Sequence, residues 1–213
     1  MAEPEEFIDA LRSVIRASRI AELSRVELAD SILSLRQLAG RLEAAAVTGE
    51  RTQASLASWS GEGPSESFSD RILHHGPESV FPYSPYVGAL NALAPPIALE
   101  AVPVHDRVEL HGRHSFAAVY NGPPNGVHGG VIAGVMDELL GSLCVANELS
   151  GFTGTLTVRY EAITPVEQLV TLRSWVERVE GRKTIACGTI HHGQTLCARA
   201  EGIFISASTL GFG

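Results

Sequence analysis

The sequence has 213 residues, of which 45% are hydrophobic and 19% are charged, and this composition is typical of a globular chain rather than a disordered one. The length allows one domain of ordinary size with an extension and is short for two domains. The formal net charge of -8 disfavours non-specific nucleic-acid binding, which needs a basic surface, while leaving room for a local basic patch.

The cysteines and the N-terminal segment indicate the cellular compartment in which the protein is expected. Cys144, Cys187 and Cys197 form no CxxC pair and lie among apolar or small residues. We interpret them as small buried hydrophobes in a reducing environment. The first residues are acidic where a signal peptide would be basic, and no stretch approaches the roughly 20 apolar residues of a membrane span. We therefore expect a cytoplasmic protein without a membrane span.

The N-terminal third has a helical pattern followed by a linker. Residues 5–47 contain no proline, and apolar residues recur at alternating spacings of four and three, at Leu28, Ile32, Leu35, Ala39 and Leu42. One long helix or two shorter ones fit this pattern, and its apolar stripe would pack on the chain's own body or on a second subunit. Residues 48–70 are rich in Ser, Gly, Thr and Glu, which is typical of a linker, whereas five prolines predict irregular structure over 71–96. We predict a helical extension and linker over 1–70 and one folded domain over 71–213.

From residue 97 the pattern predicts strands around one buried helix. Strands are expected over 97–102, 107–112, 115–120, 154–163, 168–179, 183–192 and 195–206. The segment 127–150 is apolar nearly all round, so it should form a buried helix under an antiparallel sheet. Small residues on the last two strands leave room for that helix, at Ala186, Gly188, Ala198, Ala200 and Gly202. The predicted fold class is α+β.

The start of the predicted helix has features of a reaction site. The loop at 121–126 is rich in Gly and Pro, and the helix begins near His128, Gly129 and Gly130. Two glycines in the first turn lower the stability of the helix by about 1 kcal/mol each relative to alanine. Their presence is explained if a ligand approaches the backbone closely at this point. The free N–H groups of a helix N-terminus can form an oxyanion hole.

Asp137 is a carboxylate in an apolar helix, where burial of a charged group is costly unless the group is paired. It is either a catalytic group or a side chain satisfied by nearby hydroxyls, and Glu138 beside it fits a solvated end of the helix face. His128 is either catalytic or a helix cap. These two residues are nine positions apart, which places them about 13 Å apart on roughly opposite helix faces. A shared site therefore requires two copies of the helix, and so a two-fold symmetric dimer.

Several motifs occur together in this part of the chain. VHGG at 127–130 follows the loop, Asp137 comes nine residues after the histidine, and Thr153 precedes a strand that reads TLTVRY. Pro165 and a late GRK at a hairpin follow. In this combination the segment 97–207 resembles the hot-dog thioesterases of the phenylacetate-pathway type and the related thioesterase superfamily members.

The resemblance implies a hot-dog fold, in which an antiparallel sheet wraps around one long helix, with assembly into dimers and often tetramers. It implies hydrolysis of an acyl-CoA or acyl-carrier-protein thioester and a place in fatty-acid metabolism. Asp137 then matches the acidic nucleophile or general base, and Gly129 the glycine whose N–H polarises the carbonyl. His128 matches the residue beside that carbonyl, and Thr153 the hydroxyl that orients the carboxylate or its water.

One position departs from the family pattern. Some members carry an Asn or Gln in the loop before the helix that contacts the substrate carbonyl, where this chain has Gly122. Asn121 and Asn125 lie nearby, and His128 could supply the contact instead. We predict that Asn121, Asn125 and Gly130 contact the substrate.

The expected chemistry needs no metal or other cofactor, and coenzyme A enters as part of the substrate. A thiolate is a good leaving group, so a carboxylate that activates water and an oxyanion hole could suffice. Basic candidates for the coenzyme A phosphates are Arg159, Arg178, Arg182 and Lys183, with the pair in the Gly181 turn the best placed. The alternative interpretation for these charges is ordinary solvated surface.

Two other functions remain compatible with the sequence. One is a hot-dog enoyl-CoA hydratase or dehydratase, and the other is a non-catalytic acyl-CoA-binding module. We expect the acyl pocket to be lined by Val135, Met136 and Leu139 together with the segment 71–96.

Overall fold

The structure is a computed structural model that describes residues 3–46, 49, 51–54, 66–149 and 151–206. The helices are α1 (Pro4–Ser18), α2 (Arg25–Ala44), α4 (Phe68–His75) and α5 (Gly129–Ala146), with short 3-10 helices η1 (Pro77–Ser79) and η2 (Ala118–Tyr120). The strands are β1 (Leu99–Val104), β2 (Arg107–Ser115), β3 (Gly151–Tyr160), β4 (Leu169–Glu180), β5 (Lys183–His192) and β6 (Thr195–Ser206).

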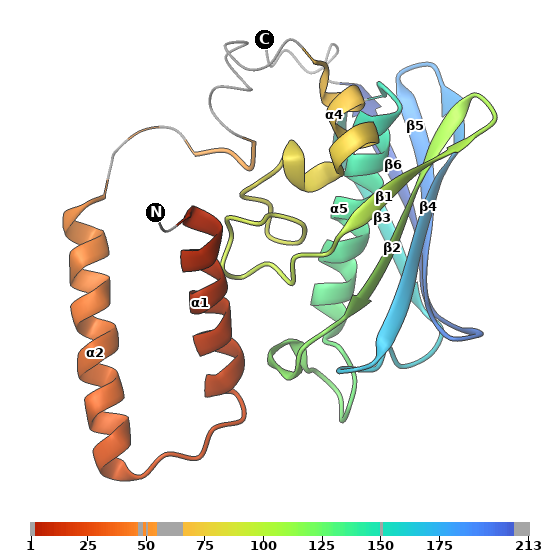
Figure 1. Cartoon of the computed structure of the whole chain (residues 1–213). Coiled ribbons are helices and arrows are strands. Elements are labelled where there is room, and N and C mark those ends of the chain that lie inside the picture. The colour runs from red at the N-terminus through yellow and green to blue at the C-terminus, as the bar shows by residue number, and fades with distance from the viewer. Residues whose placement is uncertain (1–2, 47–48, 50, 55–65, 150, 207–213) are drawn as a thin grey trace.

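One antiparallel sheet curves around α5, as Figure 1 shows. Its strand order is β1-β2-β4-β5-β6-β3, so β3 lies at one edge and β1 at the other. Tight hairpins join β4 to β5 and β5 to β6, and Gly181 and Gly193 adopt the positive φ that these turns need. The predicted sheet wrapped around a central helix is confirmed.

The core forms where α5 packs on the concave face of the sheet. A Cβ added at Gly188 or Gly202 would lie only 3.2 or 3.1 Å from the side chain of Leu140, so the small residues predicted on β5 and β6 do admit the helix. By length and hydropathy α5 could cross a membrane, yet half of it is buried inside the fold, as in a core helix. Cys144 and Cys197 are buried free thiols and Cys187 is a half-buried one.

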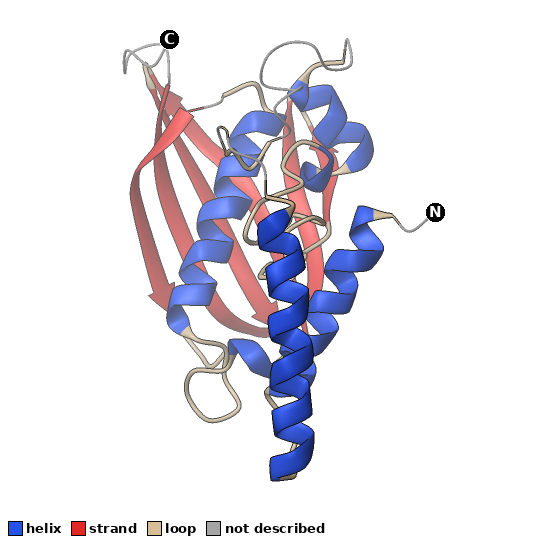
Figure 2. Cartoon of the chain, turned by 90° about the vertical axis from the view of Figure 1, so that its left-hand side faces the viewer, coloured by secondary structure: helices blue, strands red, loops and turns tan. Residues whose placement is uncertain are grey.

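The N-terminal helices form a hairpin beside this body, with α2 on the side of α1 away from the sheet (Figure 1, Figure 2). The buried guanidinium of Arg12 anchors α1, because its Nη2 donates to the carbonyls of Gly88, Ala89 and Asn91 at 2.8–2.9 Å. No residue of α2 is buried, and its predicted apolar stripe does not pack on the chain's own body. Of the two arrangements that the sequence allows, the structure has two helices.

Three predicted elements differ from the structure. The strand expected over 115–120 is wrong, because β2 ends at Ser115 and the chain turns through η2 after burying Phe116 in the core. The helix expected over 127–150 ends at Ala146, where the Asn147 side chain donates to the carbonyl of Leu143. Within the expected linker and irregular segment, α4 and η1 are helical, and residues 55–65 lie outside the described part.

Candidate active site

The loop before α5 brings two backbone segments into close contact. A Cβ at Gly122 would lie 2.7 Å from the Cα of His128, so no larger residue fits there without a shift. An Asn or Gln side chain therefore has no room at this position unless the His128 backbone shifts. The Asn121 amide donates to the carbonyls of Pro123 and Gly126, so it folds the loop.

His128 caps the N-terminus of α5. Its Nδ1 accepts a hydrogen bond from the Gly130 N–H at 3.0 Å. Within the described residues the preceding N–H, that of Gly129, has no partner, so it can donate to a ligand. The Tyr160 hydroxyl donates to the Gly129 carbonyl at 2.9 Å and so fixes this first turn to the end of β3. Sequence reasoning missed Tyr160, although it ends the TLTVRY motif.

Asp137 lies beside Thr153 in the wall of a cavity. The Thr153 Oγ1 donates to Asp137 Oδ1 at 2.9 Å, across from β3 to α5. Both residues line a cavity of about 710 Å³ between α4, α5 and the start of β3. The hydroxyl leaves the second carboxylate oxygen of Asp137 available to water or substrate.

The candidate residues fall into two groups at opposite ends of one strand. Since β3 runs antiparallel to α5, Thr153 lies at Asp137 while Tyr160 lies at Gly129. Exposed Arg159 lies beside Tyr160, at the helix-start end. Within one chain, the oxyanion-hole candidate is therefore separated from the carboxylate, as their spacing predicts.

The other predicted binding residues are placed as follows. The turn with Arg182 and Lys183 lies at the Thr153 end, because the Arg182 carbonyl accepts from Ser206 N, and Ser206 pairs with Gly151. Asn125 occupies a turn with φ +57° and is exposed. Arg178 is paired with Glu180 at 2.6 Å, which makes it a weaker candidate for a phosphate.

The lining predicted for the acyl pocket differs from that of the cavity beside Asp137, which shares only Phe81 of the segment 71–96 with it. Val135, Met136 and Leu139 are buried in the core and are not among the residues that line the cavity beside Asp137. The helix instead contributes Glu138, Gly141, Ser142 and Val145. Glu138 is half-buried, and burial raises the pKa of its carboxyl, although a hydrogen bond with Ser84 acts in the opposite direction.

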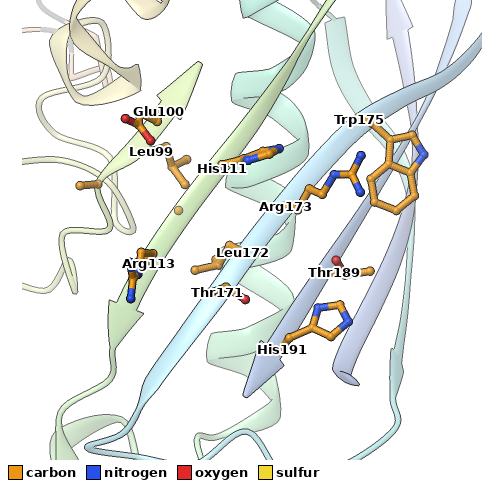
Figure 3. A pocket seen from close by; sticks show the side chains of 12 residues that line it. Leu99, Glu100, His111, Arg113, Thr171, Leu172, Arg173, Trp175, Thr189 and His191 are labelled. Carbon is orange, nitrogen blue, oxygen red and sulfur yellow. The ribbon is translucent and has the colours of Figure 1, made fainter. Parts of the chain in front are cut away.

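A second hollow of about 840 Å³ lies across β1, β2, β4 and β5 (Figure 3). Here the guanidinium of Arg173 packs over Trp175 and donates two hydrogen bonds to buried Glu109, at 2.7 and 2.8 Å. These bonds lower the pKa of Glu109 to about 2. The hollow contains none of the predicted site residues, so the cavity beside Asp137 is the candidate site. Among the described residues, no group of three or more His, Cys, Asp or Glu side chains could hold a metal ion.

Comparison with solved structures decides the fold. A crystal structure of a thioesterase superfamily protein superposes with a TM-score of 0.78 and 29% sequence identity, and the match covers 96% of this chain and 91% of that one. The chain has the hot-dog fold of the thioesterase superfamily. The match extends over nearly the whole hot-dog chain and so includes most of its N-terminal helices. The resemblance to hot-dog thioesterases that the motifs predict is confirmed.

Curated relatives match a shorter part of this hot-dog protein. Acyl-coenzyme A thioesterase THEM5 of Homo sapiens is 30% identical over 86 residues, which are 39% of this chain and 35% of that protein. Acyl-coenzyme A thioesterase THEM4 of Mus musculus is 34% identical over 86 residues, 39% of this chain and 37% of the relative. The chain thus spans little more than a third of the length of these relatives. No protein-family model matches the chain.

Proposed function

We propose that this protein hydrolyses acyl-CoA thioesters, and the pairing of Asp137 with Thr153 in the cavity wall is the observation that carries the proposal. The carboxylate takes a proton from a water molecule, whose oxygen attacks the thioester carbonyl carbon. The carbon–sulfur bond then breaks, and coenzyme A leaves as the thiol. The names of the curated relatives support the same reaction.

The oxyanion that forms on the carbonyl needs a hydrogen-bond donor. The unpaired Gly129 N–H at the start of α5 is suited to this task, because the helix dipole adds a partial positive charge there. His128 Nδ1 accepts the hydrogen bond of the neighbouring Gly130 N–H, which leaves the Gly129 N–H as the free donor of this turn. The reaction thus draws on the chain's own residues and water, with coenzyme A entering as part of the substrate.

Replacement of Asp137 tests the reaction. Asp137→Asn keeps the shape of the side chain but cannot take a proton, so turnover of an acyl-CoA should fall by about two to four orders of magnitude. The matched control is Asp106→Asn, an exposed carboxylate in the β1–β2 turn. Near-normal turnover in Asp137→Asn would overturn the assignment, and hydration of an enoyl-CoA without hydrolysis would favour the hydratase.

We propose further that two copies of the chain complete each site. The donor and the carboxylate lie at opposite ends of β3, and β3 is an edge strand. If two β3 strands pair antiparallel about a two-fold axis, the Gly129 end of one copy meets the Asp137 end of the other. Full activity of a monomer at nanomolar concentration would contradict this arrangement.

Complementation between two inactive variants gives a sharper test. Gly129→Pro deletes the N–H at a first helical position, where proline is tolerated, and the extended backbone of His128 suits a residue before proline. When this variant and Asp137→Asn are refolded together, random pairing should restore about a quarter of normal activity, since half of the dimers carry one intact site. Gly129→Ala keeps the N–H, and its Cβ meets Tyr160 at an ordinary 3.5 Å, so it should lose less activity than the proline variant. No recovery in the mixture would place the whole site within one chain.

The phosphates of coenzyme A are assigned to the turn with Arg182 and Lys183, which lies at the same end of the sheet as Thr153. Arg182→Ala should raise KM for coenzyme A esters and leave kcat unchanged, whereas the exposed Arg36→Ala on α2 should change neither. Equal KM values in the two variants would exclude Arg182 from binding.

The free cysteines support a cytoplasmic location, and the apolar cavity supports a role in fatty-acid metabolism.

A further inference from the structure

The cavity beside Asp137 continues along α5 as a chamber. Asp137, Gly141 and Val145 follow one another on one face of α5, Glu148 lies just after the end of the helix, and all four line the chamber. From Asp137 to Val145 the helix rises about 12 Å, which is long enough for an acyl tail to lie along it. A Cβ at Gly141 would meet only a ring atom of Phe204 at 3.8 Å, so the space beside this glycine is open.

Most of the chamber wall is apolar and comes from distant parts of the chain. Four phenylalanines line it, from α4, the segment after η1, β3 and β6: Phe68, Phe81, Phe152 and Phe204. Thr52, Gln53 and Ala54 close it from the N-terminal side, with Ala54 buried. Such a wall suits the hydrocarbon part of a substrate.

Among the described polar residues that line the chamber, Ser142 is the one with a buried side-chain oxygen that lacks a hydrogen-bond partner. It is 2% exposed, lines the chamber, and has a buried Oγ with no hydrogen-bond partner among the described residues. A serine within a helix commonly donates to the carbonyl four residues earlier, and this hydroxyl does not. A buried hydroxyl without a partner is costly unless a ligand supplies one. Glu138, one turn before Ser142, also lines the chamber and can accept a hydrogen bond.

We propose that the chamber selects an acyl group that carries a hydroxyl or oxo oxygen far from the thioester, and that Ser142 Oγ binds this oxygen. The inference rests on the proposed thioesterase function and specifies its substrate class. The helix rises about 7.5 Å between Asp137 and Ser142, so the oxygen belongs near the far end of a medium-length chain rather than beside the carbonyl. The Ser142 hydroxyl donates to it, and a substrate hydroxyl donates in turn to Glu138.

Matched substrates test this selection. Wild-type protein should hydrolyse ω-hydroxyoctanoyl-CoA with a kcat/KM about tenfold above that for octanoyl-CoA or β-hydroxyoctanoyl-CoA, the gain expected of one satisfied buried hydrogen bond. Ser142→Ala should hydrolyse the ω-hydroxy and plain esters equally well. The control is Ser174→Ala, because Ser174 is also buried with an unpartnered Oγ but lies on β4 outside the chamber, and this variant should keep the preference.

The outcomes separate the inference from the proposed function. Hydrolysis of all three esters without a preference for the ω-hydroxy ester, or a preference that survives in Ser142→Ala, would overturn the inference and leave the thioesterase assignment intact. Hydrolysis of none of these or of shorter acyl-CoA esters would overturn the proposed function.

A second variant keeps the test decisive if Ser142→Ala fails to fold. Gly141→Leu fills the open space in the chamber and should lower kcat/KM for all three octanoyl esters at least tenfold, with less effect on butanoyl-CoA. Unchanged length preference in that variant would place the acyl tail elsewhere and overturn the inference.

Discussion

The hydroxyl of Thr153 donates a hydrogen bond of 2.9 Å to Oδ1 of Asp137, and this bond joins the edge strand β3 to the central helix α5. The two residues are sixteen positions apart in the chain. The bond restrains the carboxylate, which lines the cavity, and leaves its other oxygen able to accept a further hydrogen bond. A general base that is held in this way is already oriented before substrate binds.

Removal of the Thr153 hydroxyl should therefore lower turnover without much effect on binding. We expect Thr153→Ala to reduce kcat for acyl-CoA hydrolysis by about ten- to a hundredfold with little change in KM, because a misplaced catalytic group costs rate. Thr153→Ser keeps the donor and should restore most of the rate. Thr155→Ala, at an exposed position on the same strand, is the control. Steady-state kinetics on the three variants check the prediction, and a normal kcat in Thr153→Ala would contradict it.

The Tyr160 hydroxyl should hold the first turn of α5 in position. Tyr160→Phe removes the hydrogen bond to the Gly129 carbonyl, so the first turn of α5 loses its tie to β3. We expect a loss of about 1 kcal/mol in the free energy of unfolding, together with a several-fold lower kcat. Urea denaturation and kinetics measure both, with Tyr83→Phe as the control, because that exposed ring lies outside the site. If both variants behave alike, Tyr160 has no positioning role.

Arg12 should control the attachment of α1. Arg12→Met keeps much of the aliphatic stem but loses the donors to three backbone carbonyls. Backbone amides of α1 should then exchange with solvent about tenfold faster, as expected when a hydrogen-bonded anchor is lost. Arg19→Met at the exposed C-cap of the same helix is the control. Hydrogen exchange by mass spectrometry reports this directly, and unchanged protection of α1 would show that another contact holds it.

The Glu109–Arg173 pair should make stability sensitive to acid. The pKa of Glu109 in the folded protein is lowered from an ordinary 4.5 to about 2. Its contribution is therefore present above about pH 4.5 and is lost as the pH falls toward 2. Because the Arg173 side chain is 56% exposed and screened by solvent, we expect only about 1 kcal/mol.

Urea denaturation across this pH range checks the sign of the effect. Glu109→Gln should be less stable than wild type at neutral pH, and the difference should shrink in acid. Glu100→Gln, an exposed carboxylate on β1, should show no such convergence. A difference that grows in acid would contradict the assignment.

The local pattern of apolar residues and turn residues in the sequence predicted much of this fold. The strands expected over 183–192 and 195–206 coincide with β5 and β6, because turns at Gly181 and Gly193 mark the start of β5 and the junction between the two strands. The segment 115–120 has apolar residues too, but tertiary packing of Phe116 bends it out of the sheet. A short apolar run does not by itself distinguish these outcomes.

The candidate site was predictable only in part. Helical spacing was enough to separate His128 from Asp137, and motif resemblance pointed to Thr153. The chamber wall could not be read locally, because Thr52, Phe81 and Phe204 meet there from distant parts of the chain. The lining role of Ser142 depends on which face of α5 lies against α4, and that is decided by packing.

The position of residues 52–54 has a consequence for how the protein could be divided. A fragment cut at residue 71, where composition suggests a domain boundary, would keep α5, the sheet and the Asp137–Thr153 bond. It would lose Thr52, Gln53 and Ala54 and most of the first turn of α4, and with them one side of the chamber. Such a fragment should react with a broader range of thioesters than the whole chain does. Catalysis and discrimination would then be separable by truncation.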